Sequence, residues 1–68
     1  MPRHIVTIVR IIGNIKKHLT AHIVGVDSNG EEWTWIQDYY FDYEEGRHNI
    51  IEGERIHLPA GAKKLIKP

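Results

Sequence analysis

Apolar and polar positions in the first part of the chain form two runs that predict β-strands. Residues 4–12 (HIVTIVRII) are almost all apolar, which is typical of a strand buried on both faces for most of its length. In residues 18–26 (HLTAHIVGV), the apolar Leu19, Ala21 and Ile23 alternate with polar neighbours. This period of two predicts a strand whose apolar face lies against a core.

A helix is the competing interpretation of residues 18–26. Apolar side chains recur there and just before at a helical spacing, at Ile12, Ile15, Leu19, Ile23 and Val26. Gly25 and the β-branched content of the segment disfavour a helix, because β-branched side chains lose χ1 freedom there. We therefore favour the strand.

A strong turn signal follows at residues 27–30 (DSNG). Asp and Asn side chains bond their own backbone, and Gly accepts the positive φ that tight turns require. A third strand is expected from residue 31 to residue 36 or 37. Residues 18–37 are therefore predicted to form a β-hairpin.

The second half of the chain is less regular. Residues 38–45 (DYYFDYEE) fit either a short capped helix or a strand that continues around a bend. A fourth strand is expected over residues 49–58, with a bulge or bend at Gly53. Residues 59–62 are expected to form a short connection, and residues 63–67 a fifth strand.

Five short strands in 68 residues predict a single mostly β domain, residues 1–68, folded as a small closed or nearly closed barrel. Two barrels fit, one OB-fold-like and the other SH3-like. An OB-fold places a helix between strands three and four, where residues 38–45 lie. An SH3-like barrel places a helical turn before strand five, where residues 59–62 lie.

In the spacing of its elements, the chain resembles the smallest OB-fold proteins, such as the bacterial initiation factor one family. The resemblance rests on the Asn29-Gly30 turn and on Glu52-Gly53-Glu54 in the fourth strand. It covers most of the chain but extends only to spacing, and it implies an OB-fold. The acidic middle of the chain departs from what such RNA-binding proteins carry, so no function is transferred.

Composition supports the β class. Eleven Ile and four Val stand against three Leu and three Ala, a bias that favours strands over a helical bundle. The absence of cysteine rules out disulfides and Cys-based zinc sites. No apolar run approaches the ~20 residues that span a bilayer, so a cytoplasmic protein without a membrane partner is expected.

A formal net charge of zero conceals a segregation of charge along the chain. Residues 1–25 carry four bases and no acid, residues 26–45 seven acids and no base, and residues 46–68 five bases and two acids. The two ends are predicted to build one basic face that binds nucleic acid through its phosphates. The phosphate-binding candidates are Arg10, Lys16, Lys17, Arg55, Lys63 and Lys64. Attraction between neighbouring strands of opposite charge is the other explanation.

All six aromatic residues lie between Trp33 and Tyr43. On a continuous strand both Trp side chains share one face with Tyr39, and Ile36 lies on the other. If the face with Trp33 is the core, the aromatics are ordinary packing. If it is exposed, Trp33, Trp35 and His22 are candidates to stack on or orient bases.

The alternative function is a protein-interaction or inhibitor module, with self-association as an option. Its surface is the acidic and aromatic segment 33–45, with Tyr39, Tyr40, Asp42 and Tyr43 as the candidate contacts. Acids that flank the aromatic stripe suit a basic partner better than a phosphate.

Enzymatic chemistry has little support. The only serine, Ser28, lies in a predicted turn, and the six glycines are too scattered to cradle a phosphate. His18 and His22 would share a metal ion on a helix, but on a strand they lie ~13 Å apart. We therefore predict no enzyme, no metal site and no cofactor.

Overall fold

The computed structural model describes residues 4–13 and 19–65, and this part of the chain contains strands and no helix. The strands are β1 (Ile5–Gly13), β2 (Thr20–Asp27), β3 (Glu32–Asp38), β4 (Phe41–Asp42), β5 (Arg47–His48), β6 (Arg55–His57) and β7 (Lys63–Lys64). The predicted mostly β class is confirmed. The helix considered for residues 38–45 is wrong, because that segment forms β4 and the turn that leads to β5.

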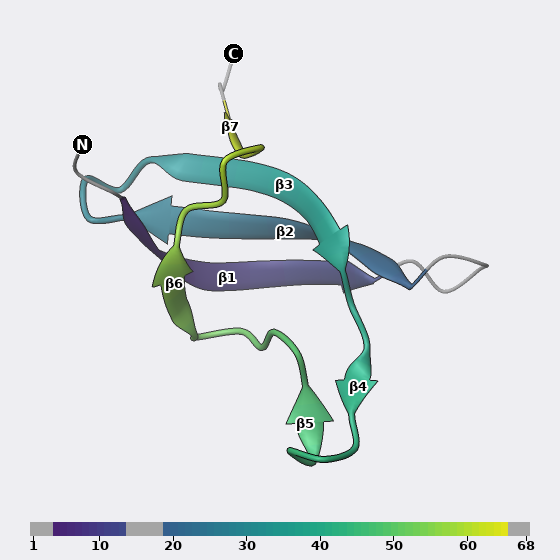
Figure 1. The fold of residues 1–68 in the computed structure, drawn as a ribbon. Helices are drawn as coiled ribbons and strands as arrows, with labels where there is room; N and C mark the ends of the chain where they lie inside the picture. The colour runs from purple at the N-terminus through teal and green to yellow at the C-terminus, as the bar shows by residue number, and fades with distance from the viewer. Residues whose placement is uncertain (1–3, 14–18, 66–68) are drawn as a thin grey trace.

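Five strands make one antiparallel sheet in the order β6-β1-β2-β3-β7, and β4 and β5 form a separate two-stranded hairpin (Figure 1). Strands β1, β2 and β3 follow one another, and β6 returns to lie beside β1. This order is a Greek key. Among the described residues no ladder joins β6 to β7, so the sheet is open and the predicted closed barrel is not formed.

The hairpin predicted over residues 18–37 is confirmed where the structure describes it, with β2 and β3 paired from Thr20↔Asp38 to Val26↔Glu32, while His18 at its predicted start lies outside the described residues. Its turn forms as the residues require. Asp27 Oδ1 accepts hydrogen bonds from the backbone N–H groups of Asn29 (2.9 Å) and Glu31 (3.0 Å). Gly30 takes a φ of 80°, a conformation that side chains other than glycine rarely adopt.

A bulge at Val9 decides how β1 is buried. Ile8 pairs with Gly25 and Arg10 pairs with Val24, so Val9 is the extra residue. Val6 and Ile8 are buried on the inner face of the sheet, whereas Ile5, Val9 and Ile12 are exposed. The expectation that residues 4–12 are buried on both faces is therefore wrong, because one face of the sheet stays open to solvent.

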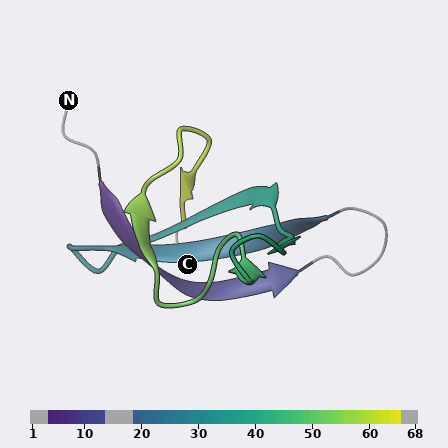
Figure 2. The ribbon, with the colours of Figure 1, turned by 60° about the horizontal axis from the view of Figure 1, so that its bottom comes forward.

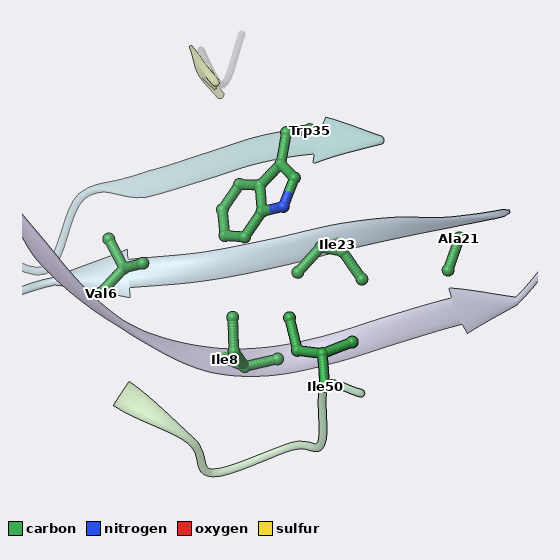
Figure 3. Packing of buried hydrophobic residues seen from close by; sticks show 6 residues of the cluster. All are labelled: Val6, Ile8, Ala21, Ile23, Trp35 and Ile50. Atoms are coloured by element: carbon green, nitrogen blue, oxygen red, sulfur yellow. The ribbon is translucent and has the colours of Figure 1, made fainter. Parts of the chain in front are cut away.

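The core lies on the inner face, between the sheet and the segment that leads from β5 to β6. Figure 3 shows its buried side chains, which are Val6, Ile8, Ala21, Ile23, Trp35 and Ile50. Ile50 comes from the segment after β5 and points toward Ile8 and Ile23. Figure 2 shows this segment running along β1 on the lower side of the sheet. Leu19, expected to point inward with Ala21 and Ile23, lies just before β2 and is 72% exposed, so that expectation is wrong.

The last strands are shorter than predicted. The expected fourth strand over residues 49–58 is reduced to β6, because Gly53 adopts a φ of 91° in a turn. The fifth strand is β7, and residues 66 and 67 of its predicted range lie outside the described residues. In the stretches that the structure covers, no helix is long and apolar enough to cross a membrane.

Candidate nucleic-acid interface

Strand register places a basic row across the outer face of the sheet. Arg10 of β1 pairs with Val24, Val24 with Thr34 of β3, and Thr34 with Lys63 of β7. The alternate positions of β2 and β3, such as the paired Ile23 and Trp35, point into the core. Because side chains alternate between the faces of a strand, Arg10 and Lys63 lie on the same, outward face.

A second row beside it is apolar with one imidazole at its centre. His22 pairs with Ile12 on one side and with Ile36 on the other. All three side chains are exposed, and Ile36 has an exposed fraction of 63%. Ile36 lies near the end of β3, and the described part of the chain leaves most of this large apolar side chain uncovered.

Arg55 extends the basic surface at the other end of β1. It pairs with Thr7, which pairs in turn with Val26. A cleft of about 580 Å³ opens there, lined by His4, Ile5, Thr7, Val26, Asp27, Ser28 and Arg55. Within the described residues, Arg10, Arg55 and Lys63 are held in no ion pair. Their charges are therefore available to a ligand.

Three other residues that were predicted to bind nucleic acid, Trp33, Trp35 and Lys64, lie on the inner side of the sheet instead. Trp35 is only 6% exposed, and its Nε1 donates to Gln37 Oε1 at 2.7 Å. Its ring belongs to the core and offers no exposed face on which a base could stack. Trp33 is half-buried, and its Nε1 donates to Asp27 Oδ2 at 3.0 Å. This hydrogen bond is the main reason that the pKa of Asp27 is lowered.

Lys64 is also directed away from the outer face. It pairs with Trp33, its Nζ lies 2.6 Å from Glu31 Oε2, and the same Nζ is 5.7 Å from the centre of a Trp33 ring. The hydrogen bond and the charge of Glu31 raise the pKa of Lys64. Lys64 is thus partnered, whereas its neighbour Lys63 is not.

The structure therefore brings together Arg10, His22, Arg55 and Lys63 from the predicted set. Lys16 and Lys17 lie outside the described residues. Sequence reasoning missed the uncharged members of the surface, which are Thr7, Ile12, Val24, Thr34 and Ile36. The alternation in β3 carried the signal for two of them: once Trp35 is assigned to the core, Thr34 and Ile36 must face outward.

The residues proposed for a protein partner lie apart from this face. Tyr39 stacks on His48, while Tyr40 and Tyr43 are exposed beside the β4–β5 hairpin. Asp42 is part of that hairpin. Over the ranges 4–13 and 19–65, no three His, Asp or Glu side chains form a group that could hold a metal ion, and His18 falls outside those ranges.

Comparison of the chain with protein-family models, with curated proteins and with solved structures gave no match. The geometry of this surface is therefore what indicates a function for the protein.

Proposed function

We propose that this protein is a small non-enzymatic module that binds nucleic acid on the outer face of its sheet. The observation that carries the proposal is the row from Arg10 to Lys63, which sets two unpaired cations on one face about 14 Å apart across three strand spacings. Arg10, Lys63 and Arg55 would contact phosphates, the main source of affinity in such complexes.

The neighbouring row supplies a surface for bases. Ile12, His22 and Ile36 present apolar and imidazole groups beside the cations. Exposed bases of a single strand can pack on such groups, whereas paired bases in a duplex are stacked on one another. We therefore propose single-stranded nucleic acid as the ligand.

Strand order gives a supporting analogy. An OB-fold is a partly open Greek-key barrel that binds oligonucleotides on the face of its second and third strands. Here the Greek key is β6-β1-β2-β3, and the proposed surface is centred on β2 and β3. An OB-fold has a helix between its third and fourth strands. In this chain the β4–β5 hairpin lies at the corresponding place, between β3 and β6. We infer that the sheet is an opened OB-like arrangement, and this inference is an analogy of fold.

Two adjacent lysines provide a matched test. Lys63 lies on the proposed surface, and Lys64 pairs with Glu31 on the opposite side of the sheet. Binding of a fluorescent single-stranded oligonucleotide is measured by anisotropy between about 50 mM and about 200 mM salt. We expect Lys63→Gln to weaken binding and to reduce the slope of log affinity against log salt by about 0.7.

Lys64→Gln removes the same charge and should leave the slope unchanged. Equal losses for the two variants would show that only net charge matters and would overturn the site. Absence of any salt-dependent binding by the unaltered protein would overturn the function. Oligo-dT and oligo-U are compared in the same assay to establish whether the 2′-hydroxyl contributes.

A further inference from the structure

The β4–β5 hairpin carries exposed aromatic side chains at a distance from the proposed nucleic-acid surface. Tyr40 and Phe41 are about half-exposed, and Tyr43 is 88% exposed. We call these three residues, together with Glu44 and Glu45, the hairpin patch. Figure 1 shows the hairpin extending away from the five-stranded sheet, so the patch is open to a large partner.

The aromatic rings of the hairpin contact one another and His48. The rings of Phe41 and Tyr43 meet edge to face at 5.0 Å, and those of Phe41 and His48 do so at 5.2 Å. The ring of Tyr39 also contacts His48, and these two rings stack with their centres 4.8 Å apart. Rings that are already positioned lose little conformational entropy on binding, which favours recognition.

A side-chain clamp fixes the base of the hairpin. Asn49 Oδ1 accepts a hydrogen bond from the Tyr40 backbone N–H at 2.9 Å, and Asn49 Nδ2 donates to the Asp38 carbonyl oxygen at 2.8 Å. At the tip, Asp42 Oδ1 accepts from the N–H groups of Glu44 and Glu45 at 2.9 and 3.2 Å. The patch is therefore a defined surface.

Charge selects the class of partner. Residues 38–45 contain four acids and no base. The first base that follows, Arg47, is neutralised by Glu54 at 3.0 Å. Among the described residues, Glu44 and Glu45 have no side-chain partner. A phosphate would be repelled here, whereas an ammonium or guanidinium group would be attracted to both the carboxylates and the ring faces.

The protein itself contains an occupied example of this chemistry. The Lys64 ammonium lies against the Trp33 ring and is paired with Glu31 at 2.6 Å. The patch offers the same two components, an aromatic face in Tyr43 and a neighbouring carboxylate in Glu44, with no cation supplied by the described chain.

We propose that the hairpin patch binds Lys and Arg side chains of an extended basic segment in a partner protein. Cation–π contacts with Tyr43, Phe41 and Tyr40 and ion pairs with Glu44 and Glu45 together carry recognition. This surface lies apart from the row between Arg10 and Lys63, so the protein can hold a basic partner while its sheet contacts another ligand.

The probe is a synthetic octalysine peptide, with an octaglutamate peptide of the same length as the control for charge. Amide chemical shifts of the full chain are followed by NMR during titration. We expect saturable shifts at residues 40–46 with octalysine and none there with octaglutamate. Tyr43→Ser should weaken octalysine binding about two- to fivefold, the size of an exposed cation–π contact.

Matched variants separate the patch from general effects. Leu19→Ser removes another exposed apolar side chain, 72% exposed, and Glu52→Gln removes an exposed acid outside the patch. Neither should weaken binding, whereas Glu44→Gln should. If Tyr43→Ser binds octalysine as tightly as the unaltered protein, the attraction is charge alone and the proposal is wrong. Losses in the two controls as large as those in the patch variants would also overturn it.

A second copy of this chain is the other partner of the hairpin patch to test, because the outer face of the sheet in that copy is basic. Hairpin shifts that change with protein concentration in the absence of peptide, and that disappear in Tyr43→Ser, would show self-association and would overturn the partner proposed here. This outcome is independent of oligonucleotide binding, which is followed separately at Lys63.

Discussion

Two hairpins of this protein, β2–β3 and β4–β5, have the same turn chemistry, but only the first belongs to the five-stranded sheet. Asp27 starts the turn between β2 and β3, and Asp42 starts the turn between β4 and β5; each accepts backbone N–H groups through Oδ1. Gly30 and Gly46 close these turns at φ values of 80° and 71°. Yet β2 and β3 pair from Thr20↔Asp38 to Val26↔Glu32 within the five-stranded sheet, whereas β4 and β5 pair over two residues each.

The difference lies in what the flanking strands can bury. β2 alternates Ala21 and Ile23 toward the core, and β3 adds Trp35 on the same face. β4 offers only Phe41 and Asp42, which remain largely outside the core. Turn residues thus decide where the chain reverses, and the number of apolar side chains on one face decides whether the hairpin becomes part of the core.

The largest expected effect tests this explanation with two isoleucines on adjacent strands. Ile23 is fully buried and Ile36 is 63% exposed. Ile23→Ala should lower the free energy of unfolding by about 2–5 kcal/mol, through lost burial and a cavity. Ile36→Ala should change it by less than about 0.5 kcal/mol. Urea denaturation measures both, and similar losses would show that the faces of β3 are assigned wrongly.

A smaller effect compares the two turn aspartates. Asp27 uses Oδ1 for the backbone and Oδ2 for the Trp33 indole N–H, whereas Asp42 accepts the Glu44 and Glu45 N–H groups through Oδ1 alone. An asparagine supplies one acceptor oxygen, so Asp42→Asn should be nearly neutral. Asp27→Asn leaves the indole N–H facing an amide donor and should lower the melting temperature.

The lowered pKa of Asp27 predicts that the stability of the fold depends on pH. Because the pKa of Asp27 is lowered from its ordinary 3.8, ionised Asp27 stabilises the fold above that value. This stabilisation is lost as the pH falls through the lowered pKa. Melting temperatures are measured from about pH 7 to about pH 2. The melting temperature of Asp27→Asn should fall less over this range than that of the unaltered protein. Equal slopes would show that other carboxylates account for the acid sensitivity.

The smallest effect is local to the β4–β5 hairpin. Asn49→Ala removes the hydrogen bonds to the Tyr40 N–H and the Asp38 carbonyl, at a cost of about 1 kcal/mol. Hydrogen exchange of the Gly46 amide, which bonds the Asp42 carbonyl at 2.8 Å, should accelerate about fivefold. Amides in β2 and β3 should be unaffected. Asn29→Ala, in the other turn, serves as the control and should leave Gly46 unchanged.

Local signals account for much of what could be predicted of the fold. The alternation in residues 18–26 and the turn at residues 27–30 are encoded by neighbours in sequence; the turn is confirmed, and the alternation is confirmed from Thr20 onward but not at Leu19. Residues 38–45 were ambiguous for the same reason. Their helix-capping residues are also turn residues, and only the pairing of Phe41 with His48 selects the hairpin.

The candidate site was predicted only in part. The basic residues at the two ends of the chain were identified from charge, but charge does not show which way a side chain points. Lys63 and Lys64 are adjacent and identical, yet β7 turns one to each side of the sheet. The uncharged residues between the cations were missed because nothing in the sequence established which face of β3 is covered.

The sequence by itself determined the β class and the position of the central hairpin, because β-branched content, period-two alternation and turn chemistry act between near neighbours. Only the tertiary structure decided which face is core. The bulge at Val9 changes the face of β1 partway along, and Ile50, distant in sequence, covers Ile8 and Ile23. Only packing between distant segments could place Trp35 inside and leave Ile36 outside.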